Sequence, residues 1–315
     1  MKIGFIGLGN VGAKLAGSLQ RNGFDIIVRD LDAATADALL AKGAEWAETP
    51  KALAEGADLI ITCLPSPRAV SEVMEADDGV IAGLGAGKIW LEMSTTDEAE
   101  VRRLGTLVEA AGAAPMEGPV SGGCHRAATV NISIFVGGER SAFEEILPAL
   151  TAMGRRILHT GPLGSASVLK VVTNYLCSVH LVALGEAMMV AKNAGMDLNT
   201  AFEAIRISSG NSFVHETECQ VILNGSYNIN FTMDLVVKDM GLFDGLARRH
   251  NVPLELSPLV LDIFKDGQAR YGDRAWSSMI VKRLEESCGT ELRAPRFPEE
   301  IVDDEAEEPG YEVIV

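Results

Sequence analysis

The chain has 315 residues, of which 47% are hydrophobic, so it is long enough to form two domains with separate cores. Its formal net charge of −17 argues against nucleic acid or an anionic membrane as a partner. The five cysteines are odd in number and include no C-x-x-C pair, which indicates reduced thiols rather than a disulfide framework. No basic and apolar leader precedes the first predicted strand, so we expect a cytoplasmic protein.

The first predicted element is the apolar strand Lys2–Ile6, which runs directly into a G-x-G-x-x-G turn. In such a turn Gly7 permits the tight bend, Gly9 lets the backbone approach a pyrophosphate, and Gly12 lets helix and strand pack closely. The helix that follows directs unpaired N–H groups at the anion. A glycine-rich turn without a ligand is the alternative, and the matching strand, helix and following acid count against it.

The second predicted strand, Asp25–Val28, leads to Asp30, about twenty residues beyond the glycines. A carboxylate at this position accepts hydrogen bonds from the adenosine ribose hydroxyls and repels a 2′-phosphate. The sequence therefore predicts NAD rather than NADP as the cofactor. Arg29, the neighbouring residue, is a feature that would weaken this preference.

Apolar strands and amphipathic helices alternate over residues 1 to about 160, which is the pattern of a parallel α/β sheet. Helices are predicted at Asp97–Ala111 and Arg140–Met153. The remaining predicted strands are Asp58–Cys63, Lys88–Glu92, Ala114–Glu117, Ile132–Val136 and Arg156–His159.

A long helix is predicted at Ser165–Asn193, and the pattern stays helical to about residue 286, with loops at 208–211 and 224–226 and no strand. The most apolar part, Tyr175–Ala191, contains a histidine and a glutamate, so we expect a buried helix rather than a membrane span. The expected fold class is α/β. An N-terminal Rossmann doubly wound sheet is joined to a C-terminal all-helical domain by this long interdomain helix.

The expected boundaries are 1–163 for the NAD-binding domain, 164–288 for a helical substrate and oligomerisation domain, and 289–315 for an acidic tail. Residues 291–315 hold nine acids and two arginines, a net charge of −7. We expect this tail to be extended, and either disordered or docked by apolar residues with its acids facing water. The candidate apolar anchors are Leu292, Phe297, Ile301, Val302 and the segment Gly310–Val315.

Polar turns follow three of the predicted strands, at the end of the sheet where α/β folds bind ligands. Leu64-Pro65 follows one strand and Ser94-Thr95 another, and an ordinary turn or a helix N-cap is the alternative for them. Ser121-Gly122-Gly123 follows the next strand and presents N–H groups and a hydroxyl suited to a carboxylate. A plain turn is the alternative there.

Two further pairs of residues lie in the helical half. Lys170 and Asn174 are four residues apart on the long helix and therefore share a face. A lysine at that place is either a solvated end residue or a partly desolvated acid–base group. Lys238 and Asp239 end an apolar stretch and open a predicted helix at Met240–Arg249, where a surface charge pair is the ordinary interpretation.

In this order the motifs resemble those of the β-hydroxyacid dehydrogenases, which include 3-hydroxyisobutyrate dehydrogenase, tartronate semialdehyde reductase and the glyoxylate and succinic semialdehyde reductases. The similarity covers residues 1 to about 286. The matching segments are Gly7-Leu8-Gly9-Asn10-Val11-Gly12, Leu64-Pro65, Ser94-Thr95, Gly118-Pro119-Val120-Ser121-Gly122-Gly123, Lys170-x-x-x-Asn174 and Lys238-Asp239.

The resemblance implies an NAD-dependent enzyme that interconverts a small β-hydroxy acid and its semialdehyde, without a metal. Lys170 looks like the general acid–base and Asn174 like its companion that orients the substrate. The helical domains are implied to pack into a homodimer or homotetramer. The implied substrate contacts are Ser121, Gly122, Gly123, Phe231 and Asp239, and the cofactor contacts are Gly7, Gly9, Asn10, Val11, Gly12, Asp30, Leu64, Pro65, Thr95 and Lys238.

Three positions depart from the family. Its members usually carry a small residue where this chain has His125 and Arg126, and a glycine where it has Val130. Arg126 is predicted to bind a second anionic or polar group of the substrate, and packing at the surface is the alternative. Among relatives of this fold, 6-phosphogluconate dehydrogenases have a larger helical domain and imine reductases replace the lysine. An inactive NAD(P)-binding scaffold or regulatory protein is the alternative from another functional class.

Overall fold

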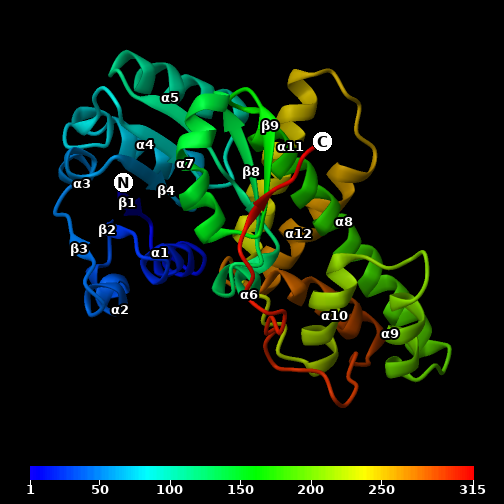
Figure 1. The fold of residues 1–315 in the computed structure, drawn as a ribbon. Coiled ribbons are helices and arrows are strands. Elements are labelled where there is room, and N and C mark those ends of the chain that lie inside the picture. The colour runs from blue at the N-terminus through cyan, green and yellow to red at the C-terminus, as the bar shows by residue number, and fades with distance from the viewer. The chain divides into compact units, whose positions relative to one another are not determined.

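The computed structural model describes the whole chain, residues 1–315. It divides into two compact units (Figure 1): the first comprises Met1–Lys170 with Asp303–Val315, and the second comprises Val171–Val302. The division lies close to the boundary expected at residue 163. The acidic tail is not a separate body, because its first part belongs to the second unit and its last part to the first.

The first unit is built around one sheet of ten strands. Its central strands are buried on both faces, as the apolar runs in the sequence require; Leu59, Ile60 and Ile61, for example, have no exposed surface. The strands in chain order are β1 (Lys2–Ile6), β2 (Asp25–Arg29), β3 (Glu45–Trp46), β4 (Leu59–Thr62), β5 (Ile89–Glu92), β6 (Ala114–Glu117), β7 (Val120–Ser121), β8 (Ser133–Gly138), β9 (Arg156–Gly161) and β10 (Tyr311–Glu312).

The strand order across the sheet is β10-β9-β8-β6-β5-β4-β1-β2-β3, with β7 paired to β8. All neighbouring pairs from β3 to β6 are parallel, and this part has the doubly wound order of dinucleotide-binding domains. β8 runs antiparallel to β6, and β9 lies beside β8 in Figure 1 as its parallel neighbour. The parallel strands therefore end at one edge of the sheet, where the predicted ligand-binding turns meet.

Helices connect these strands, and they are the main elements of the second unit, which also contains loops and the extended first part of the tail. They are α1 (Gly12–Arg21), α2 (Asp37–Leu40), α3 (Pro50–Gly56), α4 (Pro67–Glu75), α5 (Glu98–Ala110), α6 (Gly123–Ala128), α7 (Arg140–Met153), α8 (Ser165–Asn193), α9 (Leu198–Arg206), α10 (Phe213–Asn224), α11 (Met233–Arg249), α12 (Leu256–Tyr271) and α13 (Lys282–Cys288).

The predicted Rossmann sheet and all-helical second part are confirmed. The sequence missed the two-residue strands β3, β7 and β10, which are too short to show a period of two. It also placed the start of α11 too late, since that helix begins at Met233 and contains Lys238 and Asp239. Met233, Val236 and Met240 are buried at helical spacing, and this spacing was the missed signal.

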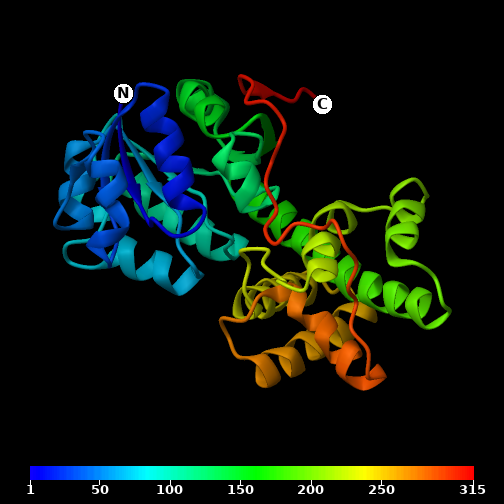
Figure 2. The same cartoon turned by 90° about the horizontal axis from the view of Figure 1, so that it is seen from below.

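Helix α8 is one unbroken helix of 29 residues, drawn in green in Figure 2. By length and composition it is the one helix that could cross a membrane, a test that core helices of soluble proteins also pass. We predicted that it would be buried, and this is only partly correct, because 28% of its most apolar window is buried inside the chain. Leu176 and Val190 are among its exposed apolar side chains.

The tail docks first on the second unit. Leu292 is fully buried there, and the Phe297 ring meets Phe202 at 5.0 Å between centroids, edge to face. Arg293 donates to Glu285 at 2.8 Å and to the Tyr227 hydroxyl at 2.8 Å. These apolar contacts at the start of the tail agree with the expected anchors.

The last part of the tail docks on the first unit, mainly through charge. Tyr311 donates its N–H to Arg155 O at 2.8 Å, and β10 adds a parallel strand next to β9. Glu312 accepts two hydrogen bonds from Arg140. The expectation of apolar anchors is wrong for most of this part, whereas most of its acids do face water and several of them also pair with arginines. The exposed apolar side chains of this part of the chain are Val302, Tyr311, Ile314 and Val315.

One backbone conformation in the first unit is unusual. Val130 has φ +66° and is 2% exposed, so a buried β-branched side chain sits in the left-handed region. For a residue other than glycine this costs about 1–2 kcal/mol. The departure of Val130 from the family pattern therefore places a β-branched side chain in a backbone conformation that glycine adopts at little cost.

Candidate active site

The glycine turn after β1 has the geometry that its sequence predicts. Gly7 has φ +99°, and a Cβ added there would lie 2.2 Å from the carbonyl oxygen of Cys63. A Cβ on Gly12 would lie 2.0 Å from the oxygen of Gly7, whereas one on Gly9 would meet nothing within 4 Å. Gly7 and Gly12 are thus required by packing, and Gly9 leaves open space beside the turn.

The start of α1 is suited to an anion. Its N-cap residue, Val11, makes no side-chain cap hydrogen bond, and the first turn carries no acidic residue. The half-positive end of the helix is therefore not neutralised by the chain itself. Asn10 lies exposed beside Val11 at this end. The turn and helix end fit the pyrophosphate of a dinucleotide.

Asp30 lies at the end of β2, and its carboxylate accepts the N–H of Leu8 at 2.6 Å and that of Asp32 at 3.2 Å. Each oxygen has a further lone pair for a ribose hydroxyl. Asp30 thus has a structural role in fixing the glycine turn, which sequence reasoning did not foresee. Arg29 points its guanidinium to Ala47 O at 3.2 Å, close to the Trp46 ring.

A buried carboxylate joins the next two turns. Glu92 accepts hydrogen bonds from the hydroxyl of Thr62 and from Ser94 N at 2.6 Å, and the Ser94 hydroxyl accepts Leu64 N at 2.7 Å. Burial raises the pKa of Glu92 to about 7, although the hydrogen bonds from Ser94 and Thr62 act in the opposite direction. The Leu64-Pro65 turn and the Ser94-Thr95 turn are therefore connected by hydrogen bonds through Ser94 and the buried Glu92.

Helix α5 begins just after Thr95. Asp97 is its N-cap and accepts the N–H of Ala99 at 2.9 Å. The helix-cap interpretation is thus correct for Asp97, and Thr95 stays half-buried on the preceding turn. The helix cap at Asp97 is therefore compatible with the predicted cofactor contact at Thr95, since they are different residues of the same turn.

The Ser121-Gly122-Gly123 turn connects β7 to α6. Gly122 and Gly123 have φ of +131° and +85°, conformations that suit glycine. A Cβ on Gly122 would lie 3.4 Å from Cδ of Arg126, and one on Gly123 would lie 2.8 Å from the His125 ring. His125 and Arg126 therefore lie directly against the predicted carboxylate-binding turn.

These two basic residues have different surroundings. Burial, followed by the charge of Arg126, lowers the pKa of His125 and so disfavours the charged form of the ring. Arg126 makes an ion pair with Glu305 of the tail at 3.2 Å. Arg126 is one positive charge beside the turn, and Lys14 is a second, because its Nζ donates to Cys124 O at 3.1 Å.

A second buried carboxylate holds the start of α8. Glu117, at the end of β6, accepts Ala166 N at 2.8 Å, Ser167 N at 3.0 Å and the hydroxyl of Ser167. Burial raises the pKa of Glu117, against these hydrogen bonds. Lys170 follows Ser167 by three residues and is 9% exposed. Glu117 thus fixes the helical turn that precedes the predicted acid–base residue.

In the second unit, Asn174 donates to Asp239 Oδ2 at 2.6 Å, and Lys238 lies 3.0 Å from Asp239 Oδ1. Asp239 is 2% exposed, so these partners stabilise a buried carboxylate. Tyr175 stacks on Phe243 at 4.1 Å between centroids, which packs α8 on α11 beside this cluster. The structure therefore brings together Asn174, Lys238 and Asp239, residues that sequence reasoning had placed in one site.

Phe231 lies at the end of the loop before α11. It is half-buried against the core of the second unit, and its carbonyl accepts Ser277 N at 2.8 Å. Sequence reasoning missed Glu92 and Glu117 as parts of the site. A charged residue at the end of an otherwise apolar buried strand was the available signal for both.

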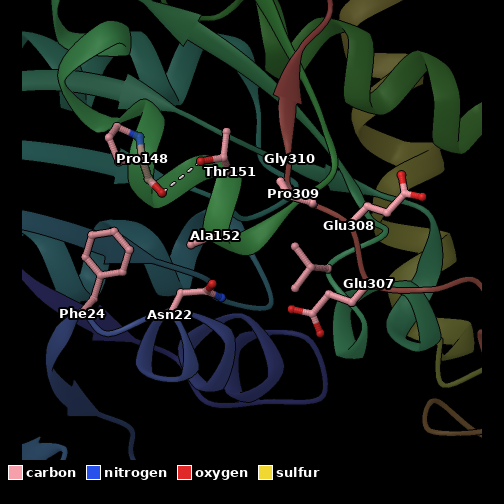
Figure 3. A pocket seen from close by; sticks show the side chains of 10 residues that line it. Asn22, Phe24, Pro148, Thr151, Ala152, Glu307, Glu308, Pro309 and Gly310 are labelled. Atoms are coloured by element: carbon pink, nitrogen blue, oxygen red, sulfur yellow. Dashed lines mark hydrogen bonds between the residues drawn. The ribbon is translucent and has the colours of Figure 1, made fainter.

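A hollow of about 540 Å³ lies elsewhere in the first unit, lined by α7, the end of α1 and the tail (Figure 3). It contains none of the predicted site residues. No group of three or more His, Cys, Asp or Glu side chains is placed to hold a metal ion.

Fold, glycine turn and acid together define a nicotinamide dinucleotide-binding protein of the dehydrogenase class. Residues 2–161 match the family model of the NAD binding domain of 6-phosphogluconate dehydrogenase. Residues 164–284 match that of the NAD-binding domain of NADP-dependent 3-hydroxyisobutyrate dehydrogenase. The cofactor of the present protein is a nicotinamide dinucleotide.

Curated relatives agree with this. The chain is 32% identical over 293 residues to 2-(hydroxymethyl)glutarate dehydrogenase of Eubacterium barkeri, covering 93% of this chain and 97% of that protein. It is 33% identical over 294 residues to an NAD-dependent L-serine dehydrogenase of Pseudomonas aeruginosa, covering 90% and 97%. Among solved structures, Mycobacterium tuberculosis 3-hydroxyisobutyrate dehydrogenase with L-serine has a TM-score of 0.81 at 26% identity, covering 90% and 98%. The chain belongs to the β-hydroxyacid dehydrogenase family.

Proposed function

We propose that the protein is an NAD-dependent dehydrogenase that interconverts a small β-hydroxy acid and its semialdehyde. The observation that carries the proposal is the glycine turn tied to Asp30 through Leu8 N at 2.6 Å, in a chain that also holds Lys170 and Asn174 one helical turn apart. The cofactor supplies the hydride acceptor or donor when it is bound.

The residues of the chain would bind, orient and exchange a proton. Ser121-Gly122-Gly123 would hold the substrate carboxylate through N–H groups and a hydroxyl. Lys170 would take the hydroxyl proton during oxidation and return it to the carbonyl oxygen during reduction. Asn174 would orient the substrate, itself fixed by its bond to Asp239. Arg126 would attract a second anionic or polar group.

We expect NAD to be preferred over NADP, because Asp30 places a negative charge where a 2′-phosphate would lie. Leu64, Pro65, Thr95 and Lys238 would complete the cofactor site, with Phe231 and Asp239 ordering the substrate side. No step in this account needs a metal ion.

We also expect a homodimer or homotetramer, without nucleic acid or membrane as a partner, in the cytoplasm. The support is the apolar surface of α8, where Leu169, Leu176 and Val190 are 38%, 46% and 69% exposed. Such a surface needs a cover, and a second copy of the helical unit would provide it. A monomer at micromolar concentration in light scattering would contradict this part.

The test is NADH formation with a panel of short hydroxy acids: the β-hydroxy acids 3-hydroxyisobutyrate, glycerate, L-serine and 2-(hydroxymethyl)glutarate, the γ-hydroxy acid 4-hydroxybutyrate, and sulfonated analogues. At least one should be oxidised with NAD as acceptor. Gly9→Ala is the matched control, because its added Cβ meets no protein atom within 4 Å and should leave the fold intact while obstructing the cofactor. If the wild type binds NAD but turns over no member, the alternative of an inactive scaffold is favoured.

A further inference from the structure

The loop between α6 and β8 is fixed by hydrogen bonds to the C-terminal tail. Val130 lies in the left-handed region, and its two neighbours, Thr129 and Asn131, both donate side-chain hydrogen bonds to Oδ2 of Asp303 in the tail. The distance from Asn131 Nδ2 is 2.8 Å. One carboxylate near the end of the chain thus binds the residues on both sides of the unusual conformation.

These hydrogen bonds are not ordinary surface contacts. Asn131 is 1% exposed, so its amide depends on protein partners rather than water. The same amide lies 3.1 Å from Glu305 O, and Arg155 donates to Asn131 Oδ1 at 3.3 Å. Removing Asp303 would take away the 2.8 Å acceptor of a buried amide, which would keep only Glu305 O at 3.1 Å, and would leave the Thr129 hydroxyl with the longer contact to Arg126 O at 3.3 Å.

The position of Asp303 is in turn fixed by the segment that follows it. In Figure 3 Glu307, Glu308, Pro309 and Gly310 of the tail form one side of the hollow that Val130 also lines. A Cβ on Gly310 would lie 2.2 Å from Gly154 O, so the tail passes directly over the backbone of the first unit. The pairing of β10 with β9 then ends this path.

The held loop leads directly to the predicted substrate turn. The hydroxyl of Thr129 lies 3.3 Å from Arg126 O, at the end of α6. Arg126 pairs with Glu305 at 3.2 Å, and its Cδ lies against Gly122. A shift of this loop would therefore move Arg126 and the Ser121-Gly122-Gly123 turn.

We propose that Asp303 is a positioning residue of the substrate site: by binding Thr129 and Asn131 it maintains the conformation of Val130 and so fixes Arg126 and the glycine turn. The role in substrate binding rests on the proposed function. The tail is then part of the substrate side of the enzyme, although no tail residue belongs to the catalytic machinery.

A double-mutant cycle tests this. Asp303→Ala should lower Tm by several degrees and raise KM for the hydroxy acid at least fivefold, with KM for NAD unchanged. Val130→Gly removes the conformational cost, so in that background Asp303→Ala should change Tm and substrate KM less than half as much. Asp304→Ala is the matched control, since it removes the adjacent exposed acid and should leave both quantities unchanged.

Two results would overturn the proposal. The first is an equal effect of Asp303→Ala and Asp304→Ala on Tm and substrate KM. It would mean that the tail acts through its overall negative charge and not through the hydrogen bonds of Asp303. The second result is an effect of Asp303→Ala that is equally large in the wild-type and the Val130→Gly backgrounds. It would show that Asp303 does not act through the backbone conformation of residue 130. The Tm arm of the cycle needs no substrate, so it still tests the coupling if no β-hydroxy acid is turned over and the proposed function fails.

Discussion

Gly7, in the glycine turn, and Val130, in the loop after α6, both hold the backbone at positive φ, +99° and +66°, yet the chain meets this requirement in two ways. At Gly7 the solution is local, because glycine is the residue that fits beneath Cys63 O. At Val130 the residue is unfavourable, and Asp303 of the distant tail binds its neighbours instead. A local solution can be recognised in the sequence, whereas a remote one is visible only in the structure.

Gly7 and Val130 shape the site, whereas Lys170 takes part in the reaction. We therefore expect the largest loss of activity when Lys170 is replaced. Lys170→Ala should lower kcat by roughly 10²–10⁴-fold, because it removes the proton donor and acceptor. The affinity for NAD should stay unchanged, as measured by fluorescence titration. Activity near that of the wild type would remove Lys170 from the mechanism, and loss of NAD binding would indicate a structural lysine.

The next effect tests the local solution. Gly7→Ala should destabilise the first unit by about 3 kcal/mol or more, because the added Cβ overlaps the backbone and φ is unfavourable. Gly23→Ala is the matched control: its φ is +83°, but a Cβ there meets nothing within 4 Å. Urea unfolding should show about 1 kcal/mol for Gly23→Ala. Equal losses in the two variants would mean that close packing at Gly7 does not matter.

The sequence predicted one of these two regions well. The strand, the three glycines and Asp30 stand in a fixed short spacing, so local geometry determines their roles. The same holds for α8, whose bounds Ser165–Asn193 agree with the prediction. The start of α11 and the path of the tail were not predictable in this way. The tail depends on ion pairs between residues over 150 positions apart, such as Arg155 with Glu308, and no local pattern encodes such pairs.

A pH effect tests the carboxylate beneath the cofactor turns. Burial raises the pKa of Glu92 to about 7 from 4.5, so the folded protein binds more protons than the unfolded chain between these values. Stability contributed by the protonated form is therefore lost as pH rises through this window, by up to about 3 kcal/mol. Glu92→Gln should lack this loss.

Urea unfolding at pH 4.5 and pH 8 measures it. The stability of the wild type relative to Glu92→Gln should fall between the two pH values. Glu109→Gln, at an exposed position of α5, should show no such change. If the difference in unfolding free energy between wild type and Glu92→Gln were the same at both pH values, Glu92 would not be the group that causes the pH dependence.

The smallest expected effect concerns cofactor choice. Asp30→Ala should weaken NAD on the order of tenfold, through loss of the ribose hydrogen bonds and of the contact to Leu8 N. Asp30→Asn keeps an acceptor for Leu8 N, so it should lose discrimination against NADP with less loss of NAD affinity. Wild-type kcat/KM values that are alike for the two cofactors would contradict the assigned preference.

The central claim is hydride transfer from the hydroxyl-bearing carbon of a β-hydroxy acid to the nicotinamide. The most direct measurement uses an accepted substrate deuterated at that carbon, with mass spectrometry of the reduced cofactor. We predict that the NADH formed carries one deuterium, and that Lys170→Ala forms it far more slowly with the label retained. Unlabelled NADH would contradict direct transfer.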